Sequence, residues 1–198
     1  MLIGQLAGFL LGIAASIAAW VLIAKTFLPR FEVSKICRDD APPGAPVRYR
    51  VKIVNLSKRR DIVDVSITVR LVLQGLVPGK PENSTFFYLP VGDGHPFPVI
   101  EARNGRVYVL HPNKIEDEHK RLPADVKKKL LLRRLDLQDV LKLDSRPIVR
   151  IAVTGAHPIG GLRRTKSLVF DVTDIEIGDF VSRQSIKIIR NVSHKALS

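Results

Sequence analysis

The stretch Val-Asp-Val-Ser-Ile-Thr-Val-Arg-Leu-Val-Leu at residues 63–73 alternates apolar and polar side chains over most of its length. Successive side chains of a β-strand point to opposite faces of a sheet, so this alternation predicts a strand with one face on a core. Residues 47–53, Val-Arg-Tyr-Arg-Val-Lys-Ile, show the same period of two. The Lys58-Arg59-Arg60 segment between the two stretches is predicted to be a hairpin loop.

Further short stretches of strand-forming residues lie between turn residues. They span residues 30–38, 85–89, 107–110, 148–154, 167–172, 175–180 and 185–189. The segment 41–46, Ala-Pro-Pro-Gly-Ala-Pro, ends the first of these strands, because proline cannot donate to a strand ladder. Many short strands joined by turns are typical of a β-sandwich, so we expect a mainly β fold.

Residues 122–143 break this pattern, because they are rich in Leu, Lys, Arg and Asp. Pro123 suits the first turn of a helix, and Asp125 would lie near the positive end of the helix dipole. We therefore expect a helical insertion between the middle strands of the sandwich.

The N-terminal residues 1–24 contain no Asp, Glu, Lys or Arg. A helix of this length rises about 36 Å and can cross the roughly 30 Å hydrocarbon core of a bilayer. A cleaved signal peptide is the competing interpretation, but no basic residue precedes the apolar run and no clear Ala-x-Ala site precedes Lys25. The sequence thus predicts a single transmembrane anchor at residues 1–24 and one domain at residues 25–198.

Four basic residues follow the anchor closely, namely Lys25, Arg30, Lys35 and Arg38. Basic residues beside a membrane span resist translocation, so we expect the N-terminus outside and the domain in the cytoplasm. The single cysteine is compatible with that compartment, because exported domains often rely on disulfides. Asn-x-Ser/Thr matches favour the opposite side, since this pattern is glycosylated only in lumenal or extracellular domains. They begin at Asn55, Asn83 and Asn191.

Small residues recur every fourth position in the anchor, at Gly4, Gly8, Gly12 and Ser16. Such a face lets two membrane helices approach closely and gain dispersion contacts. It favours a homo-oligomer or packing against a partner membrane helix. The alternative is that Gly and Ala are simply common in membrane spans.

The formal net charge of +13 belongs entirely to the residues after the anchor. A basic domain beside a membrane gains about 1 kcal/mol per Lys or Arg from anionic headgroups. Nucleic-acid binding is disfavoured, since no recognition motif is present and aromatic residues are only 6% of the chain. The candidates for contact with anionic lipid or an acidic partner are Lys127, Lys128, Lys129, Arg133, Arg134, Lys58, Arg59 and Arg60. A solvated surface is the alternative interpretation.

Patterns typical of catalysis are missing from the sequence. The histidines show no zinc-ligand spacing, and the glycine-rich segments 92–96 and 155–161 have neither a Walker ending nor a Gly-x-Gly-x-x-Gly pattern. Cys37 lies in a predicted strand, where a small buried thiol is expected. We therefore expect no metal, no cofactor, no catalytic residue and no enzymatic activity.

The last third of the chain carries a family resemblance. A predicted strand at residues 149–153 runs into Thr154-Gly155 and a glycine-rich loop, then a strand through Phe170, then Asp-Ile-Glu-Ile-Gly-Asp-Phe at residues 174–180. This order resembles the immunoglobulin-like cytoplasmic domain of inward-rectifier potassium channels, which has a comparable acidic-Ile-x-x-Gly segment. The resemblance implies an immunoglobulin-like β-sandwich on the cytoplasmic side. It does not imply conduction, because the sequence shows no second membrane helix, pore helix or filter.

Together these patterns predict a membrane-anchored, non-enzymatic interaction or regulatory module. Its basic face would bind anionic lipid or an acidic partner. One alternative is a membrane effector or pore-forming subunit that oligomerises through the glycine-rich helix. A second is a membrane-tethered hydrolase whose site forms only on folding, with His157 or His95 beside carboxylates.

Overall fold

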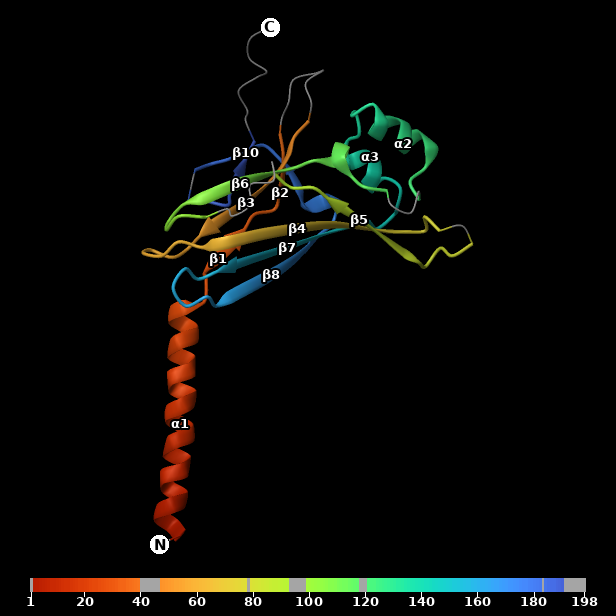
Figure 1. The fold of residues 1–198 in the computed structure, drawn as a ribbon. Coiled ribbons are helices and arrows are strands. Elements are labelled where there is room, and N and C mark those ends of the chain that lie inside the picture. The colour runs from red at the N-terminus through yellow and green to blue at the C-terminus, as the bar shows by residue number, and fades with distance from the viewer. Residues whose placement is uncertain are drawn as a thin grey trace.

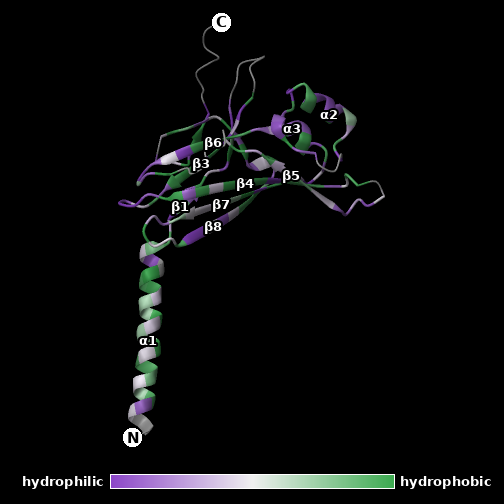
Figure 2. Ribbon diagram, in the orientation of Figure 1, coloured by the Kyte–Doolittle hydropathy of each residue, from purple (hydrophilic) through white to green (hydrophobic). Residues whose placement is uncertain are grey.

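The computed structural model describes residues 2–39, 47–77, 79–92, 99–117, 121–182 and 184–190. The predicted proline-rich break at 41–46, the loop residues 93–96 with His95, and the match at Asn191 lie outside these ranges. Helix α1 (Leu2–Phe27) extends away from a body made mainly of strands (Figure 1). Its stretch Gly4–Phe27 is long and apolar enough to cross a membrane, and its most apolar 18-residue window is not buried by the rest of the described chain. Figure 2 shows hydrophobic or neutral residues over most of this helix.

The first sheet is built around β3 (Tyr49–Asn55). One side of β3 pairs antiparallel with β6 (Gly105–Leu110). The other side pairs with β1 (Phe31–Val33) and then with β2 (Ile36–Arg38). Strand β9 (Ile175–Ile177) lies parallel to β2 and adds the C-terminal part of the chain to this sheet.

The second sheet has the order β5-β4-β7-β8, and all its pairs are antiparallel. Its strands are β4 (Val63–Gln74), β5 (Ser84–Leu89), β7 (Ile148–Ala156) and β8 (Arg163–Phe170). Figure 1 shows this sheet as the layer nearer to α1, with β3 and β6 above it. A short pair, β10 (Asp179–Phe180) with β11 (Ile188–Ile189), lies outside both sheets.

The buried side chains of both sheets form one hydrophobic core. Tyr49 and Ile53 of β3, Leu71 of β4 and Ile151 of β7 are each at most 1% exposed. Period two describes the buried face of β4, whereas β3 is buried on both faces from Val51 to Asn55. Strands occur where 47–53 and 63–73 predict them, as β3 (Tyr49–Asn55) and β4 (Val63–Gln74). The chain is mainly β with an apolar N-terminal helix.

The strand predicted at 30–38 is two strands separated by a bulge at Ser34. Val33 pairs with Ile53 and Cys37 with Arg50, so four steps along one strand match three along the other. The Ser34 hydroxyl accepts a hydrogen bond of 2.8 Å from the Lys52 N–H and so replaces a backbone carbonyl in the ladder.

The prediction of a hairpin at Lys58-Arg59-Arg60 is wrong. β3 and β4 belong to different sheets, so the loop between them crosses from one layer to the other. Both strands bury side chains in the same core. Their hydrophobic pattern therefore does not show whether they pair edge to edge in one sheet or lie face to face in two sheets. The strand predicted at 167–172 also differs, because β8 ends at Phe170 and Asp171 caps a 3-10 turn at Val172–Asp174.

The insertion predicted at 122–143 contains two short helices, α2 (Ala124–Leu131) and α3 (Leu137–Leu141). Arg133 between them has a φ of 55°, a left-handed conformation that interrupts a helix. Asp136 then caps α3, since its side chain accepts from the Gln138 N–H at 3.0 Å. In Figure 1 both helices lie on the side of the body away from α1.

Candidate functional site

The end of α1 packs against the loops of the β domain that lie nearest to it. The ring of Phe27 meets the ring of His157 edge to face, with centroids 5.0 Å apart and planes at 77°. The guanidinium of Arg60 also lies over the Phe27 ring, 5.1 Å from the ring centroid. Residues from α1, from the β3–β4 loop and from the β7–β8 hairpin tip thus form a junction.

Two guanidinium groups bind the last turn of α1. Arg60 Nη1 donates to the Thr26 carbonyl at 2.7 Å, and Arg30 Nη2 donates to the Lys25 carbonyl at 3.2 Å. The last carbonyls of a helix have no partner within the helix and carry partial negative charge. Cationic donors therefore satisfy the end of α1 where it enters the domain.

His157 is only 4% exposed, and its surroundings disfavour the charged imidazolium. Its Nδ1 accepts from the N–H groups of Ile159 and Gly160, at 3.2 and 3.0 Å, and its Nε2 lies 3.1 Å from Arg60 Nη1. An imidazolium would carry an N–H on Nδ1 as well, and this group would face the two backbone donors. Burial lowers the pKa of His157 below its ordinary value, and the Arg60 charge lowers it further.

The β3–β4 loop is held by the buried side chain of Asn55. Its amide donates to the Arg60 carbonyl at 2.8 Å and to the Ile100 carbonyl at 3.1 Å, and its oxygen accepts from the Ser57 N–H at 2.9 Å. Asn55 is 1% exposed. The Asn-x-Ser match that begins here therefore cannot carry a glycan in the folded domain.

The two ends of the same loop are bound to the last turn of α1 and to the chain just after it. Leu56 N–H donates to the Arg30 carbonyl at 2.8 Å, and Arg60 donates to Thr26. The exposed Lys58 and Arg59 lie between these two attachments. Arg164 of β8 adds a further guanidinium, with Nη1 3.5 Å from the Pro29 carbonyl. We call the set Arg30, Lys58, Arg59, Arg60, Arg163 and Arg164 the basic collar.

The other predicted basic residues lie elsewhere. Lys127, Lys128, Lys129, Arg133 and Arg134 belong to α2 and the turn after it, which Figure 1 places on the far side of the body from α1. Lys127 pairs with Asp117 at 3.6 Å and Lys129 with Asp139 at 2.7 Å. The structure thus separates the eight predicted residues into a group at the junction and a group on α2.

The small-residue face of α1 is open in the single chain. A methyl group added at Gly4, Gly8 or Gly12 would meet no atom within 4 Å. The Ser16 hydroxyl donates to the Gly12 carbonyl at 2.9 Å, so its polar group already has a partner within the helix. Only small groups lie along this face, which leaves room for the backbone of another helix.

A second polar cluster fastens the C-terminal segment to the first sheet. Arg50 forms ion pairs with Asp39 and, at 3.0 Å, with Asp179, and its guanidinium lies 5.6 Å from the Phe180 centroid. The Cys37 thiol donates to the Gly178 carbonyl at 3.1 Å. Gly178 has a φ of 153°, and a Cβ there would lie 2.1 Å from the Ile189 carbonyl oxygen, so only glycine fits.

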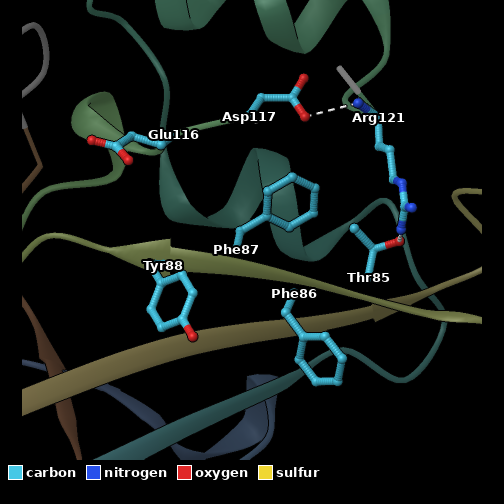
Figure 3. A pocket seen from close by; sticks show the side chains of 7 residues that line it. All are labelled: Thr85, Phe86, Phe87, Tyr88, Glu116, Asp117 and Arg121. Carbon is cyan, nitrogen blue, oxygen red and sulfur yellow. Dashed lines mark hydrogen bonds between the residues drawn. The ribbon is translucent and has the colours of Figure 1, made fainter. Parts of the chain in front are cut away.

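A small hollow of about 180 Å³ lies beside the edge strand β5 (Figure 3). Its lining includes the exposed rings of Phe86 and Tyr88. The Asp117 carboxylate in it accepts from the N–H groups of Arg121 and Leu122, at 2.8 and 3.1 Å. These two hydrogen bonds fix the segment of chain that precedes α2.

The hydrolase alternative placed His157 or His95 beside carboxylates. The partners of His157 are a guanidinium, a phenyl ring and two backbone N–H groups. The other predicted histidine, His95, lies outside the described residues. Within the described part of the chain, no group of three or more His, Cys, Asp or Glu side chains is arranged to hold a metal ion.

Sequence reasoning named Arg60 as a basic candidate but missed the other residues that build the junction. Asn55 matched a glycosylation pattern, His157 lay in a segment read as a loop, and Arg164 was one basic residue among many. Their roles depend on contacts between segments about 30 to 140 positions apart, for which the sequence carries no local signal. No protein-family model and no curated protein matches the chain, so the function rests on the geometry of this junction.

Proposed function

We propose that this chain is a non-enzymatic, single-pass membrane protein whose cytoplasmic β domain is an interaction or regulatory module with a lipid-binding basic face. The 24 residues of Gly4–Phe27 support the span, because they rise about 36 Å against a hydrocarbon core of roughly 30 Å. The basic residues that follow α1 support the cytoplasmic side. The buried amide of Asn55 removes one of the observations that favoured the opposite side.

The bond from Arg60 to the Thr26 carbonyl is the observation that carries the lipid assignment. It puts the β3–β4 loop beside the last turn of α1, where a spanning helix would leave the membrane. Lys58 and Arg59 then lie at the depth of the headgroups, where each basic residue contributes about 1 kcal/mol of attraction to an anionic leaflet. The basic residues of α2 and the turn after it lie away from the headgroups, so they provide the control for this proposal.

We also propose an immunoglobulin-like arrangement of the two sheets. Two mostly antiparallel sheets around one core support it. The segments that resemble the inward-rectifier domain occur as β7, β8, β9 and β10, in that order. A solved structure that places the strands in a different topology would contradict this arrangement.

The lipid assignment can be tested with the full chain in vesicles. Trp20 is the single tryptophan and lies in α1 seven residues before Phe27, so it can transfer energy to dansyl-labelled headgroups near the exit of the helix. We expect stronger transfer to dansyl-phosphatidylserine than to dansyl-phosphatidylcholine. Replacing both Lys58 and Arg59 by Gln removes about 2 kcal/mol of attraction, which corresponds to about a 30-fold loss of preference.

The matched control replaces Lys128 and Arg134 by Gln. This variant removes the same charge from exposed positions on the far side of the domain. It should keep the preference for phosphatidylserine. Equal losses in the two variants would show that only net charge matters, and the basic collar would then have no specific role.

Association through α1 is part of the same proposal. The open face at Gly4, Gly8 and Gly12 favours a second copy or a partner helix. A membrane-effector function would use the same face. A membrane effector would be toxic when expressed, and Gly8→Leu would abolish this toxicity. A protein that is harmless on expression would exclude the effector function.

A further inference from the structure

The tip of the β7–β8 hairpin, residues 157–162, exposes a large apolar side chain. Ile159 is 82% exposed and Leu162 is 37% exposed. Keeping an apolar side chain as exposed as that of Ile159 in water costs free energy. The groups around Ile159 therefore indicate what kind of surface would cover it. Leu131 of α2 is comparably exposed, at 84%, and provides a comparison of equal size.

The tip lies directly against the end of α1. A Cβ on Gly160 would be 3.1 Å from the Phe27 ring carbon Cδ1, and the His157 ring contacts the same phenyl group. Phe27 is the last residue of α1. If α1 spans the bilayer, the tip must therefore lie at the boundary between headgroups and acyl chains. Figure 1 shows Leu131's helix, α2, on the other side of the domain.

The conformation of the tip is held by its own hydrogen bonds. His157 N–H donates to the Leu162 carbonyl at 2.9 Å, and Gly161 N–H donates to the His157 carbonyl at 3.0 Å. The N–H groups of Ile159 and Gly160 donate to His157 Nδ1. The exposure of Ile159 is thus a property of an ordered turn, which presents this side chain without further ordering.

Basic groups surround the apolar tip. Arg163 and Arg164 follow it in β8, and Arg60 contacts its first residue, His157. Apolar side chains flanked by Lys and Arg are typical of segments that lie in the membrane interface, where the apolar part enters the acyl boundary and the cations meet phosphates. The charge around Ile159 therefore complements an anionic lipid surface.

We propose that the β7–β8 tip is a second membrane contact, in which Ile159 enters the leaflet through which α1 leaves the bilayer. This inference rests on the proposed function, because it requires α1 to span the membrane. Two attachments, α1 and the tip, limit tilting of the domain relative to the membrane plane. The basic collar and the outer face of the β5-β4-β7-β8 sheet then keep a constant orientation toward the lipid.

The test uses the full chain in vesicles with an environment-sensitive fluorophore on single introduced cysteines. Ile159→Cys is the probe and Leu131→Cys is the control, since both positions are exposed and the native Cys37 is fully buried. Lipids with a nitroxide near the headgroup should quench the probe at position 159 at least three-fold more than the probe at 131. Iodide in the water should quench the two in the opposite order.

Each remaining outcome contradicts part of the interpretation. Equal lipid quenching at 159 and 131 overturns the second contact. Protection of position 159 from iodide without lipid quenching shows that a protein, either a second copy or a partner, covers the tip, and also overturns it. Quenching of Trp20 tests the membrane span separately from the tip contact. If lipid nitroxides quench Trp20 but not the probe at position 159, the span stands and only the tip proposal fails. If they quench neither, the proposed membrane span fails with it.

Discussion

Arg60 Nη1 lies 3.1 Å from His157 Nε2 and 2.7 Å from the Thr26 carbonyl oxygen. One guanidinium therefore links α1, the β3–β4 loop and the β7–β8 tip. This link has consequences for stability that can be measured.

Replacing Arg60 by Gln should destabilise the junction by about 1.5 to 3 kcal/mol, the range for hydrogen bonds made by charged groups. The Thr26 carbonyl loses its donor and the Phe27 ring loses its cation contact. Urea unfolding of the full chain in detergent micelles measures the loss. Arg59→Gln removes an equal charge from an exposed neighbour and should leave the midpoint within about 0.5 kcal/mol of the original stability. Equal effects of the two substitutions would contradict the role of Arg60.

The stability of the domain should fall as the pH falls below about 6.5. The pKa of His157 is lowered in the fold, mainly by burial and then by Arg60. The unfolded chain takes up a proton near pH 6.5 while the folded chain still excludes it, so stability is complete above that pH and declines below it. The slope contributed by His157 reaches at most about 1.4 kcal/mol per pH unit.

Unfolding free energies between pH 7 and pH 5 measure this slope. His157→Gln keeps a neutral acceptor for the Ile159 and Gly160 N–H groups but cannot be protonated, so its curve should be flatter over this range. An unchanged slope in the variant would assign the pH dependence to other groups.

Gly8→Leu should reduce association between copies of α1. The added side chain fills the face along which two backbones could approach. Energy transfer between donor- and acceptor-labelled chains in vesicles measures association. Ala14→Leu is the control, because successive helix residues turn by 100° and position 14 lies about 140° around the helix from the middle of the glycine face. Association that survives Gly8→Leu, or is lost equally in Ala14→Leu, would exclude this face.

Cys37 should be unreactive toward thiol reagents at pH 8 while the domain is folded. Burial raises the pKa of its thiol to about 11, so the thiolate that reacts is scarce, and its Sγ–H donates to the Gly178 carbonyl. We expect labelling at least 100-fold slower than in urea. The introduced thiol of Ile159→Cys is the exposed reference. Rapid labelling of Cys37 in the folded chain would show that β2 and the Gly178 segment separate readily.

The local patterns of the sequence determined which segments form helix and strand. Residues 1–24 contain no charge and are long enough to cross a bilayer, and the period of two at 63–73 put Val65, Val69 and Leu71 on one buried face. The apolar helix and the buried strand face both occur in the structure, because each depends only on neighbouring residues. The boundary between α2 and α3 also had a local signal, Asp136 with Asp139 three residues later, which was overlooked.

The tertiary structure alone decided how these segments meet. It separated β3 from β4 into two sheets and placed Lys58 and Arg59 beside α1, while it put the equally basic α2 on the far side. It also brought His157 to Arg60 across 97 positions of sequence. Hydrophobic periodicity shows which face of a strand is buried but not which strand lies opposite, because any apolar face can satisfy it. Only the folded core, with its paired strands, brought Arg60 to the end of α1 and to His157 and so specified the junction.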